Sequence, residues 1–319
     1  MVDDDVIDRF GSVLRYLCLG MMDEPVRISV LSWSTRQLDD AIGPARVLRA
    51  PRSIWPWRRW NPQEVLSDLE LDPPDIVHCF SPRLLERVRT WTDAWRSTPV
   101  VHVADLVDVR HLTAQDPAVG IRVVAVTPSV EKVLIELRPE FREVTRVIPI
   151  GIAAQAEAGC LGQPDRVPAC IVTLPLRRDS RIAHLLRALQ TVVHSGQEVQ
   201  LFLISSGPAE QGLRRLAGQL GILRHVTFAA GMSGWRMIEE AMRAADFYIM
   251  PAPQRRFSAT RLIALACGLA IIAPRGTCED YLIDGTTARL SNTDRPDQLT
   301  RVWQDLLDDR AAARQLAES

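Results

Sequence analysis

Phe247-Tyr-Ile-Met250 begins a pattern that continues with Thr260-Arg-Leu-Ile-Ala-Leu-Ala-Cys267 and ends with Ala270-Ile-Ile-Ala273. The first and last pieces are short and almost wholly apolar, which is typical of strands covered on both faces of a sheet. The middle piece spaces its apolar residues as an amphipathic helix does. Strand, helix and strand in this order predict two parallel strands joined by a crossover helix.

The same alternation of apolar runs and helical segments extends along the rest of the chain, in two series. The first series has expected strands at Val26–Ser32, Ile76–Cys79, Val100–Val103, Val123–Thr127 and Val147–Ile148. The second has expected strands at Cys170–Leu174, Val199–Ser205, Val226–Ala229, Phe247–Met250 and Ala270–Ala273, with helices at Ala183–Val193, Gly212–Leu220, Trp235–Ala244 and Thr260–Cys267. A series that restarts predicts two doubly wound, Rossmann-like α/β domains whose carboxyl edges face one cleft.

The segment from Gly151 to Pro168 lacks sustained periodicity and is interpreted as an interdomain linker. We therefore expect an N-terminal domain over residues 1–152 and a C-terminal domain over residues 165–319. Near the start, a helical pattern runs from Asp8 to Met21 with almost nothing before it. The first strand of the N-terminal domain is expected to be absent or minimal.

The composition is that of an ordinary soluble globular protein, with 47% hydrophobic and 24% charged residues among 319. Lysine and arginine together number 38 against 39 acidic residues, which gives a formal charge of −1. A nucleic-acid binder needs a broad positive surface, so nucleic acid is not an expected partner.

Lys132 is the only lysine in the chain, and no glycine-rich loop precedes it. A phosphate loop of the Walker type, a kinase lysine and a pyridoxal Schiff base each need a lysine in a defined setting, so these chemistries are excluded. The pattern G-x-G-x-x-G of dinucleotide-binding domains is also absent. Any bound anion is expected to be held by arginines, backbone amides or helix N-termini.

The six cysteines are scattered, with no pair or cluster at zinc spacing, so no metal site is expected. They are Cys18, Cys79, Cys160, Cys170, Cys267 and Cys278. The acidic start of the chain is unlike a signal peptide, and the longest apolar stretch, Leu262 to Ala273, is too short to span a bilayer. We expect reduced, buried thiols in a cytoplasmic protein.

Several stretches match one known family in order and spacing over roughly residues 70 to 290. In the first half they are Pro74-Asp-Ile-Val-His78, Thr127-Pro-Ser129 and Val147-Ile-Pro-Ile-Gly-Ile152. In the second half they are Leu201-Phe-Leu-Ile-Ser-Ser-Gly-Pro208, Val226-Thr-Phe-Ala-Ala-Gly231, Ala245-Asp-Phe-Tyr-Ile-Met-Pro251, Phe257–Gly268 and Ile271-Ile-Ala-Pro-Arg-Gly276. The chain resembles the retaining GT-B glycosyltransferases of the family-4 type, also described as glycosyl transferases group 1.

The resemblance implies sugar transfer from a nucleotide-diphosphate donor, held mainly by the C-terminal domain, to a carbohydrate or lipid-linked acceptor. No cofactor is implied beyond that donor. Implied donor contacts are Arg177, Arg178, Arg181, Gly207, Arg255, Phe257, Ser258, Ala259 and Thr260. Implied acceptor-side residues are Ser81, His102 and Asp105.

The departures from the family concern catalysis. Two glutamates of the family fall at Arg255 and Ile263, and the histidine of its N-terminal domain falls at Ala104. The arginine and lysine that clamp the donor fall at Pro175 and Ser180, so Arg177, Arg178 or Arg181 would have to replace them. We expect impaired activity and a buried, core role for Ile263. The alternative function is a catalytically inactive homologue that acts as a partner-binding or glycan-binding subunit.

Each candidate also has a structural interpretation. The three arginines are either an anion site or the solvated start of a helix beginning at Ser180. His78 and His102 lie in apolar strands and are either core histidines or acceptor contacts, whereas Asp105 is either a site residue or a helix cap.

The stretch Ile54–Trp60 interleaves three tryptophans with two arginines. The tryptophans are Trp55, Trp57 and Trp60. They either pack as a loop on the N-terminal domain or make a peripheral contact with the inner face of a membrane or with a partner.

Overall fold

The computed structural model describes residues 1–34, 45–49, 69–115, 120–152, 161, 163, 166–230, 235–276, 279–293 and 295–319. These residues form two compact units. The N-terminal unit comprises Met1–Gly151 together with Arg255–Ala259, and the C-terminal unit comprises Ile152–Gln254 together with Thr260–Ser319. The chain therefore leaves the C-terminal unit after Gln254 and returns to it at Thr260. No local sequence pattern predicts this excursion.

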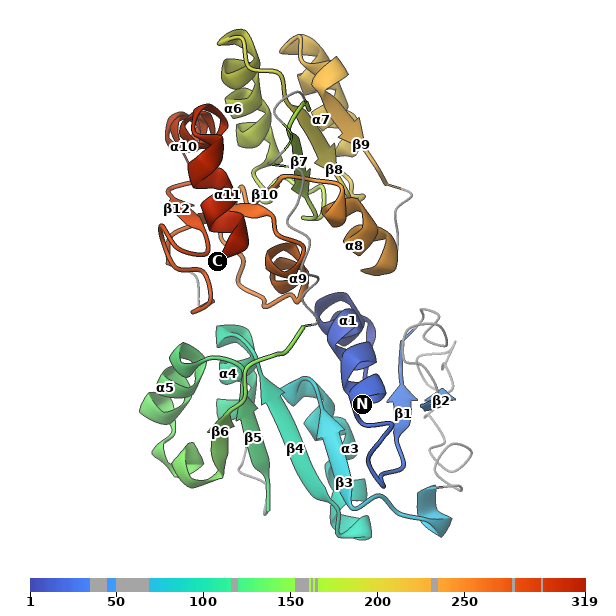
Figure 1. Cartoon of the computed structure of the whole chain (residues 1–319). Coiled ribbons are helices and arrows are strands. Elements are labelled where there is room, and N and C mark those ends of the chain that lie inside the picture. The colour runs from blue at the N-terminus through green and yellow to red at the C-terminus, as the bar shows by residue number, and fades with distance from the viewer. Residues whose placement is uncertain are drawn as a thin grey trace. The chain divides into compact units, whose positions relative to one another are not determined.

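The N-terminal unit contains only parallel strand pairs among its described residues. One sheet has the order β3-β4-β5-β6, formed by β3 (Ile76–Cys79), β4 (Thr98–Val103), β5 (Arg122–Ala125) and β6 (Thr145–Val147) (Figure 1). A second, two-stranded sheet pairs β1 (Ser29–Ser32) with β2 (Arg46–Arg49). Before β1 only Val2 makes a bridge, to Ser32. The expectation of a minimal first strand is confirmed.

Four helices of the N-terminal unit begin at an oxygen-bearing side chain that accepts a backbone N–H of the first turn. They are α1 (Asp4–Gly20), α3 (Pro82–Trp95), α4 (Leu106–Thr113) and α5 (Pro128–Leu137), and their caps are Asp3, Ser81, Asp105 and Thr127. The last three caps follow β3, β4 and β5 closely, so each strand end is also the start of the next helix. Such caps stabilise a helix by about 1 kcal/mol each.

The C-terminal unit is built on one six-stranded parallel sheet with the order β12-β11-β10-β7-β8-β9. Its strands are β7 (Ala169–Val172), β8 (Gln200–Leu203), β9 (Val226–Phe228), β10 (Phe247–Ile249), β11 (Ala270–Pro274) and β12 (Arg289–Ser291). The order reverses between β7 and β10. In doubly wound sheets, ligands bind beyond the carboxyl ends of the strands at such a reversal.

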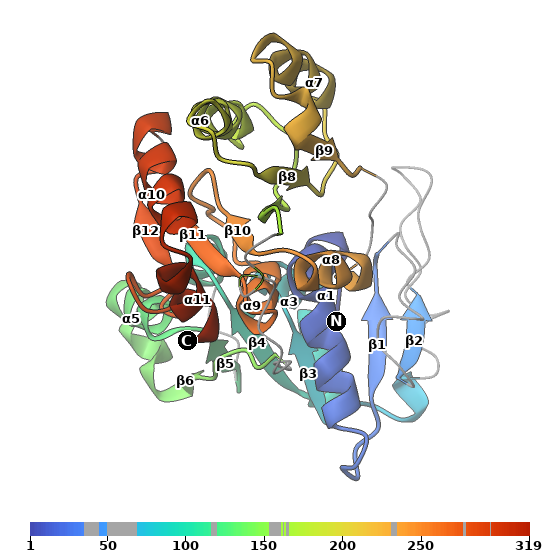
Figure 2. The ribbon, with the colours of Figure 1, turned by 45° about the horizontal axis from the view of Figure 1, so that its top comes forward.

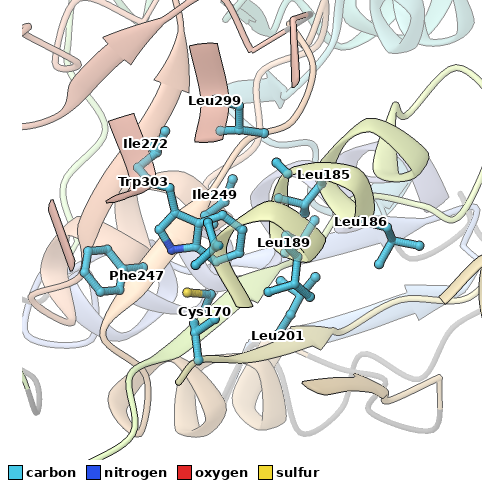
Figure 3. Packing of buried hydrophobic residues seen from close by; sticks show 14 of the residues in the cluster. Cys170, Leu185, Leu186, Leu189, Leu201, Phe247, Ile249, Ile272, Leu299 and Trp303 are labelled. Carbon is cyan, nitrogen blue, oxygen red and sulfur yellow. The ribbon is translucent and has the colours of Figure 1, made fainter. Parts of the chain in front are cut away.

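Alternate residues of these strands enter two different hydrophobic clusters, because successive side chains point to opposite faces of a sheet. Cys170 and Phe247 pack against Leu185 and Leu189 of α6 (Ile182–His194) and against Trp303 of α10 (Pro296–Asp308), and all five side chains are almost fully buried (Figure 3). Remaining helices of the unit are α7 (Glu210–Gln219), α8 (Trp235–Arg243), α9 (Thr260–Ala266), α10 (Pro296–Asp308) and α11 (Arg310–Glu318). Burial of each large apolar side chain contributes about 1.5–3 kcal/mol.

The other face of the sheet carries Ile171, Tyr248 and Ile271, packed with residues of α9. Helices α8 and α9 lie beside each other there (Figure 2). Ile263 of α9 is only 3% exposed within this cluster. The predicted core role of Ile263 is confirmed, and helices covering both faces make the sheet doubly wound.

Among the described helices, none combines the length and the apolar character needed to cross a bilayer. Four cysteines, Cys18, Cys79, Cys170 and Cys267, are buried free thiols. Burial raises the pKa of Cys79 and of Cys267 to about 11. These thiols therefore remain protonated at neutral pH. Cys160 and Cys278 lie outside the described residues.

Candidate functional site

The loop that follows β7 carries the arginines predicted to bind an anion. Arg177 and Arg178 are exposed, and no hydrogen bond or ion pair within the described part of the chain engages their guanidinium groups. Asp179, also exposed, follows them. The loop starts at the carboxyl end of β7, next to the point where the strand order reverses. This position and these two free cations suit an anionic ligand.

Gly207 determines the path of this loop. Leu176 donates its amide to the carbonyl of Ser206 at 3.1 Å and accepts the amide of Ala209 at 2.9 Å. The two backbones approach so closely that a Cβ atom on Gly207 would lie 2.3 Å from the carbonyl oxygen of Leu176. Glycine is required here for close approach, and it anchors the arginine loop.

We expect Gly207→Ala to lower the free energy of unfolding by about 2–3 kcal/mol, because two backbone segments must separate to admit the methyl group. Gly212→Ala is the matched control: nothing lies within 4 Å of its Cβ position. Gly212 is the third residue of α7, where alanine is a better helix former than glycine, so this variant should not lose stability. Urea unfolding of both variants measures the contrast. Equal stabilities would show that the loop is not anchored at Gly207.

Helix α6 does not begin at Ser180, so that prediction is wrong. The Ser180 hydroxyl instead donates to the carbonyl of Arg177 at 2.6 Å and closes a turn. Arg181 takes the N-cap position in the left-handed region, with φ of 57° and no side-chain cap. A serine hydroxyl can either cap a helix or bond to a nearby carbonyl, and the Ser180 hydroxyl forms the bond that closes the turn. Arg181 is half-buried and immediately precedes the helix, whereas Arg177 and Arg178 extend from the turn.

A buried polar network lies close to the same sheet edge. The hydroxyls of Thr173 and Tyr248 are 2.7 Å apart, and Arg261 of α9 forms a buried ion pair with Glu279. Tyr281 donates its hydroxyl to Glu279 at 2.7 Å. Burial raises the pKa of Tyr248, so its hydroxyl stays protonated. Sequence reasoning missed Arg261, although a charged residue inside an apolar helical pattern signals a buried partner.

The N-terminal unit holds a second set of charges, which we call the aspartate–arginine cluster: Asp5, Arg9, Asp105, Asp108 and Arg256. The Arg9 guanidinium donates to Asp105 at 2.8 Å and to Asp108 at 2.7 Å. Arg256 donates to Asp5 at 2.6 Å and to Asp108 at 3.1 Å. Burial raises the pKa of Asp108, against the opposing effect of Arg9. Asp105 is thus both a helix cap and an ion-pair partner.

The cluster holds the segment Arg255–Ala259, which we call the docked turn. Phe257 donates its amide to Asp105 at 2.8 Å, and Ala259 donates its amide to the carbonyl of Arg9 at 2.8 Å. The resemblance implies Phe257 and Ala259 as donor contacts. In this structure the amides of both residues donate to protein acceptors. The docked turn is part of the N-terminal unit.

The other residues of this stretch differ in exposure. Arg255 is exposed, whereas Ser258 and Thr260 are half-buried. Of the two neighbouring arginines, only Arg256 is engaged with the cluster, so Arg255 is the one whose charge faces solvent.

The residues predicted to lie on the acceptor side have structural roles in the N-terminal unit. Ser81 is buried and caps α3. His102 lies in a ring stack with His78 and Phe80, each pair of centroids 4.6 Å apart. Burial, followed by the effect of His78, lowers the pKa of His102 to about 3. Burial also lowers the pKa of His78 to about 4. Both rings are neutral at neutral pH, as core histidines are.

One ring nitrogen of each histidine, Nε2 of His78 and Nδ1 of His102, has no hydrogen-bond partner among the described residues. The same residues contain no group of His, Cys, Asp and Glu side chains that fits a metal ion. Trp55, Trp57 and Trp60 lie outside the described residues, so their interpretation stays a prediction.

Residues 168–309, which include the arginine loop, the Gly207 turn and α9, match the family described as glycosyl transferases group 1. This match covers less than half of the chain. A curated relative from Mycolicibacterium smegmatis, GDP-mannose-dependent alpha-(1-6)-phosphatidylinositol monomannoside mannosyltransferase, is 31% identical over 164 residues, covering 48% of this chain and 42% of the relative.

A second curated relative, from Corynebacterium glutamicum, is named GDP-mannose-dependent monoacylated alpha-(1-6)-phosphatidylinositol monomannoside mannosyltransferase. It is 29% identical over 158 residues, covering 47% of this chain and 40% of the relative. The matches thus span less than half the length of these two relatives.

Solved structures extend the comparison to the whole chain. Anabaena HepE in complex with UDP superposes with a TM-score of 0.71 at 17% identity, covering 98% of this chain and 90% of that one. Sucrose-phosphate synthase from Thermosynechococcus elongatus gives 0.72 at 16% identity, covering 96% and 85%. At this level of identity the likeness concerns the fold. The chain therefore has the GT-B fold.

Proposed function

We propose that this GT-B protein binds a nucleotide-diphosphate sugar through the arginine loop of its C-terminal unit and transfers the sugar to a carbohydrate or lipid-linked acceptor. The observation that carries the proposal is the pair of unengaged, exposed arginines Arg177 and Arg178 at the carboxyl end of β7. Two guanidinium forks neutralise a diphosphate and supply several donors to it. The names of the curated relatives make GDP-mannose the first donor to test.

The roles of the remaining residues follow from their exposure. Arg255 keeps an exposed charge, and Arg181 precedes α6, whose first amides point out of the helix. Thr260 is the first residue of α9, and Ser258 lies in the docked turn just before it. Position 263 offers no carboxylate to the donor, because it holds an isoleucine, and that isoleucine is buried in the apolar cluster.

Calorimetric titration with GDP, UDP and ADP tests the binding step. We expect one of these nucleotides to bind the wild-type protein and to bind Arg177→Ala/Arg178→Ala at least about tenfold more weakly, since charge-assisted hydrogen bonds contribute about 1.5–3 kcal/mol. Arg187→Ala is the control, because Arg187 is an exposed arginine on the next turns of α6. Binding that does not depend on Arg177 and Arg178 would contradict the proposed site.

A second candidate function is a catalytically inactive homologue that binds a partner or a glycan. Two observations favour it: Ile263 is a core residue, and Asp105, next to Ala104, is bound by Arg9 instead of facing a substrate. Release of nucleotide from GDP-mannose, UDP-glucose and ADP-glucose separates the candidates. Turnover of any donor supports the enzyme, and binding without turnover supports the inactive homologue.

We also propose that the protein makes a peripheral contact with the membrane through Trp55, Trp57 and Trp60, where a lipid-linked acceptor would lie. The curated relatives are named as acting on phosphatidylinositol monomannosides, which motivates this part of the proposal. Co-sedimentation with vesicles containing phosphatidylinositol tests it, with all three tryptophans replaced by serine as the comparison. Aromatic residues favour the lipid interface, so the variant is expected to stay in the supernatant.

A further inference from the structure

We infer that Arg9 is a positioning residue that fixes the docked turn, and with it Arg255 and Ser258, on the N-terminal unit. The docked turn ends at Ala259, and Thr260 is the first residue of α9. The fixation itself is independent of the proposed function. Its consequence for donor binding rests on that function, because Arg255 and Ser258 are among the proposed donor contacts.

Arg9 holds the backbone of the docked turn at two points. Its Nε donates to the carbonyl of Phe257 at 3.1 Å, and its own carbonyl accepts the amide of Ala259 at 2.8 Å. Asp105, which Arg9 orients, accepts the amide of Phe257 at 2.8 Å. Both polar backbone groups of Phe257 are therefore satisfied by the N-terminal unit. Buried backbone groups that lose such partners cost about 1–3 kcal/mol each, so the turn cannot easily adopt another path.

Charge reinforces the same arrangement. Asp105 and Asp108 are 4% and 1% exposed, and the Arg9 guanidinium bridges them. The docked turn contributes the second cation, Arg256, which bonds to Asp5 and Asp108. Three carboxylates facing two guanidinium groups still carry a net negative charge. A buried carboxylate needs a paired cation, so the cluster holds Arg256 and with it the docked turn.

An apolar contact lies directly beside the charges. The rings of Phe10 and Phe257 stack with centroids 5.3 Å apart, and both side chains are almost fully buried. Arg9 and Phe10 are consecutive residues of α1. Arg9 binds the backbone of the docked turn, and Phe10 packs against its one aromatic side chain, Phe257. Stacked aromatic pairs add about 0.5–1.5 kcal/mol to the effect of burial.

Arginine is required at position 9 because of its shape. A planar guanidinium donates along several fixed directions, which lets Arg9 reach two carboxylates and a carbonyl together. A lysine ammonium is a compact charge that keeps the carboxylates compensated without the fork geometry. Arg9→Lys therefore separates positioning from charge compensation.

Hydrogen exchange followed by mass spectrometry, on the full chain without ligand, tests the inference. In the wild-type protein we expect the amides of Phe257 and Ala259 to be as protected as those of α4. In Arg9→Lys we expect exchange in the docked turn to be faster by about tenfold and exchange in α6 to be unchanged, with the melting temperature lowered by only a few degrees. A purely structural role of Arg9 would slow or speed exchange only in step with global stability.

Arg256→Gln is the second variant, and its partly exposed side chain makes it the safer one for folding. It should also speed exchange in the docked turn, whereas Arg255→Gln, the exposed neighbour, should not. Unprotected amides in the wild-type docked turn would overturn the inference, as would wild-type protection in Arg256→Gln. Absence of nucleotide binding would reject the proposed function and leave the exchange result standing, so the two failures are distinguishable.

Discussion

Replacement of Ile263 by glutamate is expected to lower the free energy of unfolding of the C-terminal unit by about 4 kcal/mol or more. The variant loses the burial of an isoleucine, about 1.5–3 kcal/mol, and places an unpaired carboxylate in an apolar cluster, which costs several kcal/mol more. The neighbours of Ile263 in that cluster include Ile271 and Leu269, which offer no hydrogen-bond donor from their side chains. Thermal and urea unfolding measure the loss.

The matched control is Ile283→Glu, the same substitution at a position that is 52% exposed in the same unit. It should change stability by no more than about 0.5 kcal/mol. Equal effects at both positions would contradict the core role of Ile263. A stable Ile263→Glu variant with higher nucleotide affinity would show instead that the position faces a ligand, as it does by resemblance in the active family.

Acid is expected to destabilise the N-terminal unit through His78 and His102. Their pKa values in the folded protein, about 4 and about 3, lie below the ordinary 6.5 of histidine. The unfolded chain therefore binds protons below pH 6.5 while the folded protein does not. Stability falls as the pH drops from 6.5 towards 4, by about 2 kcal/mol per histidine at pH 5, so the two together remove about 4 kcal/mol.

The double variant His78→Phe/His102→Phe keeps the aromatic stack with Phe80 and removes both titrations, so its stability should fall less steeply between pH 7 and pH 5. Asp108 acts in the opposite sense, because a raised pKa lets the folded protein gain stability as the pH falls. Asp108 is present in both proteins, so their difference isolates the histidines. His194→Phe, at an exposed position, is the control and should keep the wild-type slope. Parallel slopes for the wild type and the double variant would refute the assignment.

Much of the fold was predictable because apolar periodicity is a local property. The strand Ile76–Cys79 was predicted with the bounds that the structure has, and the helix expected at Ala183–Val193 is α6 within one residue at each end. Short elements with little apolar character, such as β2 and β12, were missed. They form because a neighbouring strand offers hydrogen bonds. A local sequence pattern does not predict such pairing.

The candidate site was only partly predictable. The arginine loop and the Gly-Pro turn follow their strands in sequence, and Asp105 was weighed as a helix cap, the role that it has. The cap prediction failed at Ser180, where a competing acceptor, the carbonyl of Arg177, lies in the same turn. Arg9 resembled any charged residue of a surface helix, since nothing near it in the sequence marks a burial site.

The sequence by itself determined the α/β class, the restart of the alternation after the linker segment and the apolar fate of Ile263, because each depends on residues a few positions apart. Tertiary structure alone decided that Arg9 is buried and that the docked turn belongs to the N-terminal unit. The contacts responsible join Arg9 to Asp105 across 96 positions and to Phe257 across 248. A buried charge is stable only where its partners converge, and convergence over such separations is a property of the folded chain.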